Sequence, residues 1–281
     1  MRILLTGADG FTGRHVSSFA QKNGYEVIGL TADLTNPRAV LDEVTKVSPT
    51  HVIHLAAISA VTHADEEAFY KVNLFGTQHL LQALSSIPST PKKIVLASSA
   101  NVYGNALVSP ISESVCPKPV NHYAISKLAM EFMSTSFAQR LPIVIGRPFN
   151  YTGVGHDNRF VVPKIVDHFK RRTPEIELGN LQVLREYNDV RAVCEAYLGL
   201  LQSGIPGEVY NIASGRAVSL QTIISTLEKL TKHSMNVKVN PAFVRANEIE
   251  MLSGSAKKIE TLLGPLNHPS LETTLGWMID G

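Results

Sequence analysis

The sequence has little excess charge, few cysteines and no long apolar run. Its 281 residues hold 26 Lys and Arg against 24 Asp and Glu, a formal net charge of +2. Such a balance gives no strong attraction to nucleic acid or to an anionic membrane, so we predict neither as a partner. No apolar run reaches the roughly 18 residues that a membrane-spanning helix needs. The chain enters a strand pattern at Arg2 without a charged leader, and we expect a cytoplasmic protein.

Cysteine and histidine are placed in ways that do not suggest a metal site. The two cysteines, Cys116 and Cys194, lie far apart and cannot form a disulfide framework, so we interpret both as free thiols in a reducing compartment. His51 and His54 are three residues apart in strand-like text, where they would face opposite sides. We therefore predict no bound metal.

Strand and helix signals alternate through the first half of the chain. The apolar, β-prone runs are continuous, as in strands covered on both faces, and cover residues 2–6, 26–30, 51–55, 93–98 and 142–147. The helical patterns between them cover residues 11–22, 37–47, 65–86 and 121–140. This alternation predicts an α/β fold with a Rossmann-type doubly wound parallel sheet.

The rhythm changes after about Asn150. Shorter helical patterns at 161–172, 190–202 and 219–231 mix with short strand patterns at 208–212 and 236–240. No Gly-, Ser- or Pro-rich linker separates the two parts. We predict a dinucleotide-binding domain over residues 1–150. Residues 151–281 are predicted to form mainly a smaller mixed α/β substrate lobe, with some segments returning to the first domain.

The stretch TGADGFTGR, residues 6–14, places Gly7, Gly10 and Gly13 between a strand and a helix. A glycine at the turn accepts positive φ, and another lets the backbone approach a ligand closely. The free N–H groups of the following helix attract phosphate. A glycine-rich turn without a ligand is the alternative for such a pattern alone. At the first strand–helix junction of the chain, the pattern favours a dinucleotide pyrophosphate site.

The stretch YAISK places Tyr123 and Lys127 four residues apart, on one face of a helix. A nearby ammonium lowers the pKa of a phenol from its usual value of about 10. Tyr123 could then exchange a proton with a carbonyl or an alcohol. The same spacing alone would also fit a solvated helix face.

Five motifs occur in the order TGADGFTGR, HLAA, KVNLFGT, LASSANVYG and YAISK. Together they resemble the extended branch of the short-chain dehydrogenase/reductase superfamily over nearly the whole chain. The resemblance implies an enzyme in which Ser99, Tyr123 and Lys127 are catalytic. Ser99 would hydrogen-bond the reacting oxygen, and Lys127 would also hold the nicotinamide ribose.

The resemblance also implies a nicotinamide dinucleotide cofactor and a set of residues that bind it. In the order of the chain, these are Gly7, Asp9, Gly10, Phe11, Thr12, Gly13, Arg14, Asp33, Leu34, Leu55, Ala56, Ala57, Asn73, Ser98, Tyr123, Lys127 and Arg147. Asp33 and Leu34 would lie on the adenine side. For Ser98, packing at the strand end is the alternative.

The choice between NADPH and NADH depends on the end of the second strand. An NAD-preferring site often has an acid there that binds the ribose, and this chain has Thr31. Without an acid, a 2′-phosphate would not be repelled, and Arg14 could pair with it. An exposed helical arginine is the alternative for Arg14. We favour NADPH as the hydride donor, with NADH tolerated.

The second half carries substrate-side motifs in RPFNYTG, REYNDVR and VRANEIE. The resemblance implies that the substrate is a nucleotide sugar. Its predicted contacts are Ser99, Asn101, Tyr123, Asn150, Arg185, Arg245 and Glu248. A surface ion pair is the alternative for each arginine. Asn101 stands where related dehydratases carry a carboxylate, and an amide cannot serve water elimination. Simple hydride chemistry therefore remains.

Within the superfamily, the combination of RPFNYTGVG, GNL and REYNDVRAV resembles the branch that converts GDP-4-dehydro-6-deoxy-D-mannose to GDP-D-rhamnose. We predict NAD(P)H-dependent reduction of the 4-keto group of such a sugar. Three departures leave the nucleotide base open: Glu186 replaces an aspartate, Ala192 replaces an acid, and SSANVYG reads more like an epimerase.

The alternatives are a UDP-sugar 4-epimerase that retains NAD and a non-catalytic dinucleotide-sensing protein. The resemblance also implies a homodimer, because many extended relatives dimerise through two long helices, which correspond here to 65–86 and 121–140. Packing onto the sheet is the alternative use of the same faces.

Overall fold

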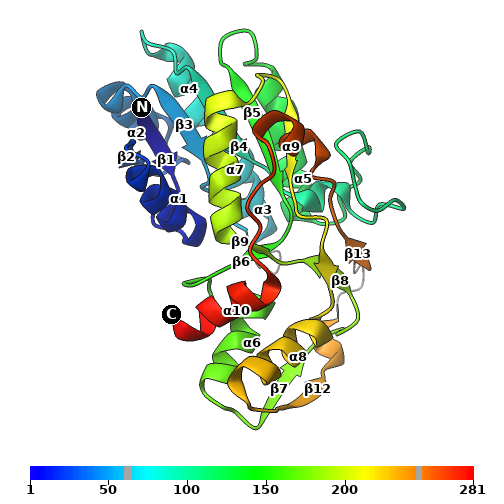
Figure 1. Cartoon of the computed structure of the whole chain (residues 1–281). Coiled ribbons are helices and arrows are strands. Elements are labelled where there is room, and N and C mark those ends of the chain that lie inside the picture. Colours follow the sequence, from blue (N-terminus) through cyan, green and yellow to red (C-terminus); the bar gives the residue numbers. More distant parts are fainter. Residues whose placement is uncertain (60–64, 245–248) are drawn as a thin grey trace.

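The computed structural model describes residues 1–59, 65–244 and 249–281. A six-stranded, fully parallel sheet forms the centre of the larger part (Figure 1). Its strands, in the order β10-β5-β4-β3-β1-β2, are β10 (Val209–Ile212), β5 (Ile143–Pro148), β4 (Lys93–Ala97), β3 (His51–His54), β1 (Arg2–Thr6) and β2 (Glu26–Gly29). The strand order reverses between β1 and β3, so the topological switch point lies at the carboxyl ends of these two strands.

Helices cover both faces of the sheet, so the inner strands are apolar along their length. One face packs against α2 (Pro37–Val47), α4 (Thr77–Ser86) and α5 (His122–Thr135). The other face packs against α1 (Phe11–Lys22) and α7 (Val190–Ser203), with α9 (Lys257–Leu263) beside α7. This arrangement confirms the predicted doubly wound sheet.

Two of the predicted helices differ from the structure. The helix expected over 65–86 is divided into α3 (Glu66–Phe69), a π-helical segment η1 (Tyr70–Gly76) and α4. The helix expected over 121–140 ends at Thr135 as α5. The hydroxyls of Ser134, Thr135 and Ser136 each donate to the carbonyl three residues earlier. Such bonds compete with the helical pattern, which explains the early end.

The second lobe lies below the carboxyl ends of the sheet strands (Figure 1). Its helices α6 (Val161–Lys170), α8 (Leu220–Thr231) and α10 (Leu271–Asp280) pack around Ile165, Phe169, Leu227 and Leu275. A parallel pair, β7 (Glu175–Leu178) and β12 (Asn236–Val239), completes the lobe. The chain returns to the sheet at α7, β10 and α9 before it ends in α10.

Short segments connect the two parts. They are η2 (Ala100–Tyr103), β6 (Tyr151–Thr152), β8 (Leu184–Glu186), β9 (Asn188–Asp189), β11 (Ala217–Val218), η3 (Pro241–Phe243) and β13 (Met251–Leu252). The Glu186 carboxylate is fully buried and accepts from the N–H groups of Gly254 (2.6 Å), Ser214 (2.7 Å) and Gly215 (3.1 Å). It therefore ties three chain segments together, which gives this acid a structural role.

None of the helices in the described ranges combines the length and apolar character needed to cross a membrane.

Candidate active site

A cleft of about 1290 Å³ separates the carboxyl edge of the sheet from the second lobe. Pockets for a single small ligand are typically about 300–1,000 Å³, so this cleft has room for more than one ligand. Many of the predicted site residues line it. These are Gly7, Gly10, Phe11, Thr12, Gly13, Arg14, Leu55, Ala56, Ala57, Ser98, Ser99, Asn101, Tyr123, Lys127, Asn150 and Arg185.

The glycine loop leaves no space for side chains where it turns into α1. Gly7 has φ of +68°, and a Cβ built on it would lie 2.9 Å from the backbone nitrogen of Ala56. A Cβ on Gly13 would lie 2.0 Å from the carbonyl oxygen of Gly7. Gly10 begins the helix without a side-chain cap, so helix N–H groups face the cleft. This loop fits a dinucleotide pyrophosphate.

A buried chain of hydrogen bonds holds the loop after β3. His54 Nδ1 lies 2.7 Å from Thr6 Oγ1, and His54 Nε2 lies 2.7 Å from Thr77 Oγ1. Because the Thr77 hydroxyl donates to the carbonyl of Asn73, we assign Nε2 as the donor and Nδ1 as the acceptor. Burial, with a smaller effect of Lys127, lowers the His54 pKa to about 3. The ring therefore stays neutral in the folded protein.

The three predicted catalytic residues lie together at the cleft floor, all nearly buried. Ser99 follows β4, whereas Tyr123 and Lys127 share a face of α5. The backbone N–H and side-chain amide of Asn101 both donate to Ser99 Oγ, at 3.1 and 3.2 Å. With its oxygen so engaged, the Ser99 hydroxyl is free to donate toward Tyr123. Sequence reasoning assigned Asn101 to the substrate, and the structure adds this contact to Ser99.

Burial shifts the proton affinities of this group. It raises the pKa of Tyr123, and a hydrogen bond with Ser99 opposes the shift. Burial lowers the pKa of Lys127 to about 8, while the carboxylate of Glu131 acts in the opposite direction. Lys127 Nζ donates to the carbonyl of Ala97 at 2.7 Å, which aims the ammonium at the end of β4.

Arg147 and Glu131 form a buried ion pair next to the catalytic group. Arg147 Nε and Nη2 bind the two carboxylate oxygens of Glu131 at 2.9 and 2.5 Å. Ser98 Oγ donates to the same carboxylate, and Arg147 Nη1 donates to the Tyr103 hydroxyl at 2.9 Å. Arg147 was predicted to bind the cofactor. In the structure its guanidinium binds these partners, and it is not among the residues that line the cleft.

Four other residues predicted to bind the cofactor are also not among those that line the cleft. Leu34 is buried in the core, and the Asp33 carboxylate accepts from the N–H and hydroxyl of Thr35, both at 2.8 Å. Asn73 bonds Ile58 and Ser126, and the carbonyl of Asp9 accepts from Arg14 at 2.6 Å. In this structure the polar groups among them form hydrogen bonds within the protein, and Leu34 packs in the core.

On the substrate side, Arg185 lines the cleft with two further cations of the second lobe, Arg159 and Lys164. Arg159 pairs with Asp157 at 2.9 Å. Lys164 Nζ donates to the carbonyl of Glu177 at 2.8 Å. Arg185 itself donates to the carbonyls of Leu184, at 2.9 Å, and Ile249. Cationic side chains in a cleft lining suit a diphosphate. The predicted residues Arg245 and Glu248 lie outside the described residues.

Sequence reasoning missed several residues of the site. Glu131 stands four residues after Lys127, a helical spacing that could have indicated the contact. Tyr151 lines the cleft and shares a hydrogen bond of 2.8 Å with the hydroxyl of Thr12. Nothing in the local sequence indicates that second contact, because 139 residues separate the two. No group of three or more potential metal ligands occurs among the described residues.

Comparison with known proteins agrees with this geometry. A model of the NAD dependent epimerase/dehydratase family matches residues 3–213. A GDP-6-deoxy-D-talose 4-dehydrogenase from Aggregatibacter actinomycetemcomitans is 35% identical, with 94% of this chain and 92% of the relative covered. A GDP-6-deoxy-D-mannose reductase from Pseudomonas aeruginosa is 31% identical, with 98% and 91% covered. The structure of RMD from Pseudomonas aeruginosa complexed with NADPH superposes with a TM-score of 0.91 at 28% identity, covering 99% and 96%.

Proposed function

Because the chain belongs to the NAD dependent epimerase/dehydratase family, we propose that it reduces a GDP-linked 4-keto-6-deoxyhexose. It is an NAD(P)-dependent oxidoreductase of nucleotide sugars, and the finer assignment is GDP-4-dehydro-6-deoxy-D-mannose to GDP-D-rhamnose. The observation that carries the proposal is the group of Ser99, Tyr123 and Lys127 at the cleft floor, with an amide at Asn101. A relative named for GDP-6-deoxy-D-mannose reduction supports the base and the sugar.

The residues divide the chemistry between them. The glycine loop would hold the nicotinamide dinucleotide, which when bound would supply the hydride for C4. The Tyr123 hydroxyl donates its proton to the C4 oxygen, which becomes the new alcohol. Ser99 donates a hydrogen bond to the same oxygen and orients the ketone. The Lys127 ammonium stabilises the phenolate that Tyr123 leaves behind.

A second product has its own support. The relative at 35% identity is named for GDP-6-deoxy-D-talose, the C4 epimer of the rhamnose product. Both sugars arise from the same ketone when hydride reaches opposite faces of C4. The configuration at C4 of the isolated product distinguishes the two.

The decisive experiment supplies the purified protein with GDP-4-keto-6-deoxymannose and a reduced dinucleotide. We expect loss of the reduced nicotinamide absorbance and one GDP-deoxyhexose, whose C4 configuration is read by proton NMR. Tyr123→Phe should lose at least about a hundredfold in turnover, the usual contribution of a general acid. Tyr70→Phe is the matched control, since the Tyr70 hydroxyl bonds His122 outside the cleft lining.

The same assay tests the other functions. Conversion of UDP-glucose to UDP-galactose without net coenzyme consumption would make the protein an epimerase. If the protein binds the dinucleotide but converts neither GDP-4-keto-6-deoxymannose nor UDP-glucose, it would be a non-catalytic dinucleotide-sensing protein. Either result would overturn the proposal.

We also propose a homodimer through the predicted pair of helices, 65–86 and 121–140. Phe75, Ile125 and Phe132 remain exposed on η1 and α5 in the single chain, with Phe132 68% exposed. A second copy would bury these side chains against each other. Light scattering should give twice the chain mass of 30.6 kDa, and Phe132→Lys should give the single mass. A monomeric wild-type protein would contradict this assembly.

A further inference from the structure

The loop after β2 lies beside the glycine loop. The N–H of Leu30 donates to the carbonyl of Leu5 at 2.9 Å, which extends the pairing of β2 with β1. A Cβ built on Gly29 would lie 2.9 Å from the Cβ of Ala8. Thr31, the residue after Leu30, therefore stands at the edge where dinucleotide-binding folds recognise the adenosine ribose. No acid occupies that position in the sequence.

The structure supplies an acid from another element. Glu43 lies on α2, and both its carboxylate oxygens face the loop that follows β2. Oε1 accepts from the Thr31 N–H at 2.9 Å, and Oε2 accepts from the Thr31 hydroxyl at 3.0 Å. Oε2 also accepts from the Ala32 N–H at 2.7 Å. These bonds hold a negative charge at the end of β2.

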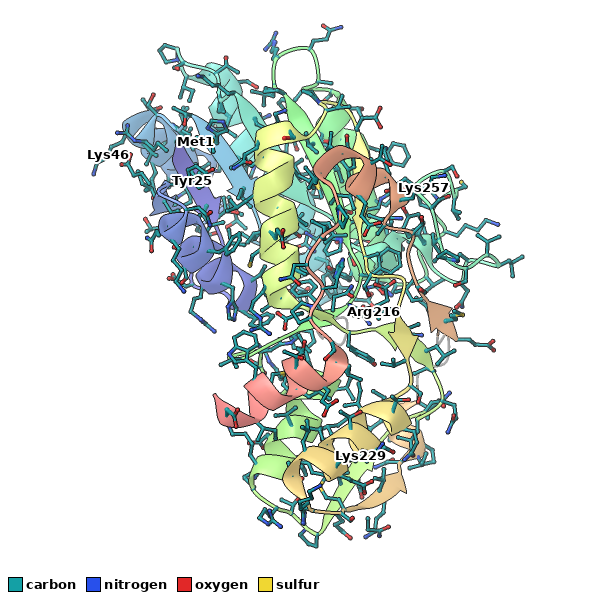
Figure 2. The ribbon with its side chains drawn as sticks, in the orientation of Figure 1. Met1, Tyr25, Lys46, Arg216, Lys229 and Lys257 are labelled. Atoms are coloured by element: carbon teal, nitrogen blue, oxygen red, sulfur yellow. The ribbon has the colours of Figure 1, made fainter. Side chains whose placement is uncertain are left out.

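The cations near this loop do not pair with Glu43. Arg14, which could have met a 2′-phosphate, donates to the carbonyls of Asp9 at 2.6 Å and Gly155 at 3.2 Å. Arg38 on α2 pairs with Asp42 at 3.1 Å. Lys46 stands three residues after Glu43 on α2 and extends outward from the helix (Figure 2). Within the described residues, no cation forms an ion pair with Glu43.

A second carboxylate adds to the charge of the loop. Asp33 is exposed, and hydrogen bonds from the Thr35 backbone and side chain lower its pKa. Asp33 is therefore ionised at neutral pH. The local field at the end of β2 is negative, although the position that usually carries the acid holds a threonine.

We propose that Glu43 selects the coenzyme, by favouring the 2′-hydroxyl of NADH over the 2′-phosphate of NADPH. Its carboxylate accepts three hydrogen bonds and keeps one lone-pair position for a ribose hydroxyl. A 2′-phosphate carries nearly two negative charges at neutral pH and meets the same carboxylate as a like charge. The sequence favoured NADPH from Thr31 and Arg14, and this carboxylate was absent from that reasoning.

The test measures coenzyme binding without a sugar substrate. The inference rests on the proposed function only in that the cleft binds a reduced dinucleotide. The Kd of NADH and of NADPH is determined by nicotinamide fluorescence at low salt. We expect NADH to bind about tenfold more tightly, the repulsion between one carboxylate and a doubly charged phosphate at roughly 6 Å in water. Added salt should reduce the ratio.

Two variants separate the charge of Glu43 from charge in general. Glu43→Gln should remove most of the tenfold preference, whereas Asp42→Asn, with the same charge change on the same helix, should keep it. Thr31→Val removes a partner of Glu43 and leaves the carboxylate, so the preference should persist. Thermal unfolding checks that each variant is folded; if Glu43→Gln is not, the salt dependence of the wild-type ratio decides.

The outcomes are distinct. Equal binding of both coenzymes by the wild-type protein overturns the inference, as does a wild-type preference for NADPH. A Glu43→Gln variant that keeps the wild-type ratio overturns it as well. Failure to bind either coenzyme instead contradicts the proposed reductase function.

Discussion

The buried pair of Glu131 and Arg147 makes a strong prediction about stability. Their side chains are 6% and 7% exposed, and two hydrogen bonds join them. Arg147→Met keeps the length of the side chain but leaves the Glu131 carboxylate buried with Ser98 as its remaining side-chain partner. Removing one member of such a pair typically costs about 3–5 kcal/mol, because the other charge loses its compensation.

This cost is a large part of the free energy of unfolding of a folded chain, which is typically about 5–15 kcal/mol. For a chain of this size, each kcal/mol lowers the Tm by roughly 2–4 °C, so Arg147→Met should unfold about 10 °C earlier. A double variant, Arg147→Met with Glu131→Leu, removes both charges. It should recover most of the loss, since apolar groups of similar volume can replace a buried pair.

Urea unfolding followed by circular dichroism gives the free energy of unfolding of the wild-type protein, of Arg147→Met and of the double variant. The fourth corner of the cycle, Glu131→Leu alone, gives the coupling between the two residues. If Arg147→Met costs less than about 1 kcal/mol, the pair does not hold the site together as argued. A double variant no more stable than Arg147→Met would also refute the reasoning, because uncompensated charge would then not be the cause.

Three further predictions concern the pH dependence of activity, the pH dependence of stability and the glycine loop. Lys127 acts as an ammonium with a pKa near 8, so kcat/KM for ketone reduction should fall as the pH rises through about 8, measured by coenzyme oxidation. The pKa of His54 is about 3 in the folded chain and near 6.5 when unfolded, so its contribution to stability is complete above pH 6.5 and is lost as the pH falls. At pH 5 the loss should be about 2 kcal/mol, and His54→Gln should show a shallower acid dependence in urea unfolding. Gly13→Ala should abolish dinucleotide binding or unfold the loop, as titration and thermal melts would show, because its Cβ meets backbone at 2.0 Å.

The elements of this fold that depend on local pattern were predictable. The glycine spacing of residues 7–13 reflects backbone conformation and close approach, which any such loop requires. The spacing of Tyr123 and Lys127 places both on one helix face whatever surrounds them. The continuous apolar strands likewise predicted a sheet covered on both sides, and the structure confirms it.

Contacts between distant segments were not predictable in the same way. Arg147 stands at the end of a strand, and its sequence neighbours do not reveal that α5 presents Glu131 to it. Glu43 reaches Thr31 only because the fold brings α2 against the loop that follows β2. The π-helical turn at Tyr70–Gly76 has no periodic signature in the sequence. In each case the partner is chosen by packing, which single-sequence patterns do not contain.

The burial of the catalytic group favours the direction of reaction that we propose. A proton donor for ketone reduction must hold its proton at neutral pH, and burial raises the pKa of Tyr123 accordingly. The same burial would strip the proton from Lys127, and Glu131 opposes that loss. The Arg147 guanidinium binds both oxygens of the Glu131 carboxylate and compensates its charge in the interior. The ion pair below the cleft therefore positions charge for Lys127, so that Tyr123 can stay protonated until hydride transfer creates a basic oxygen.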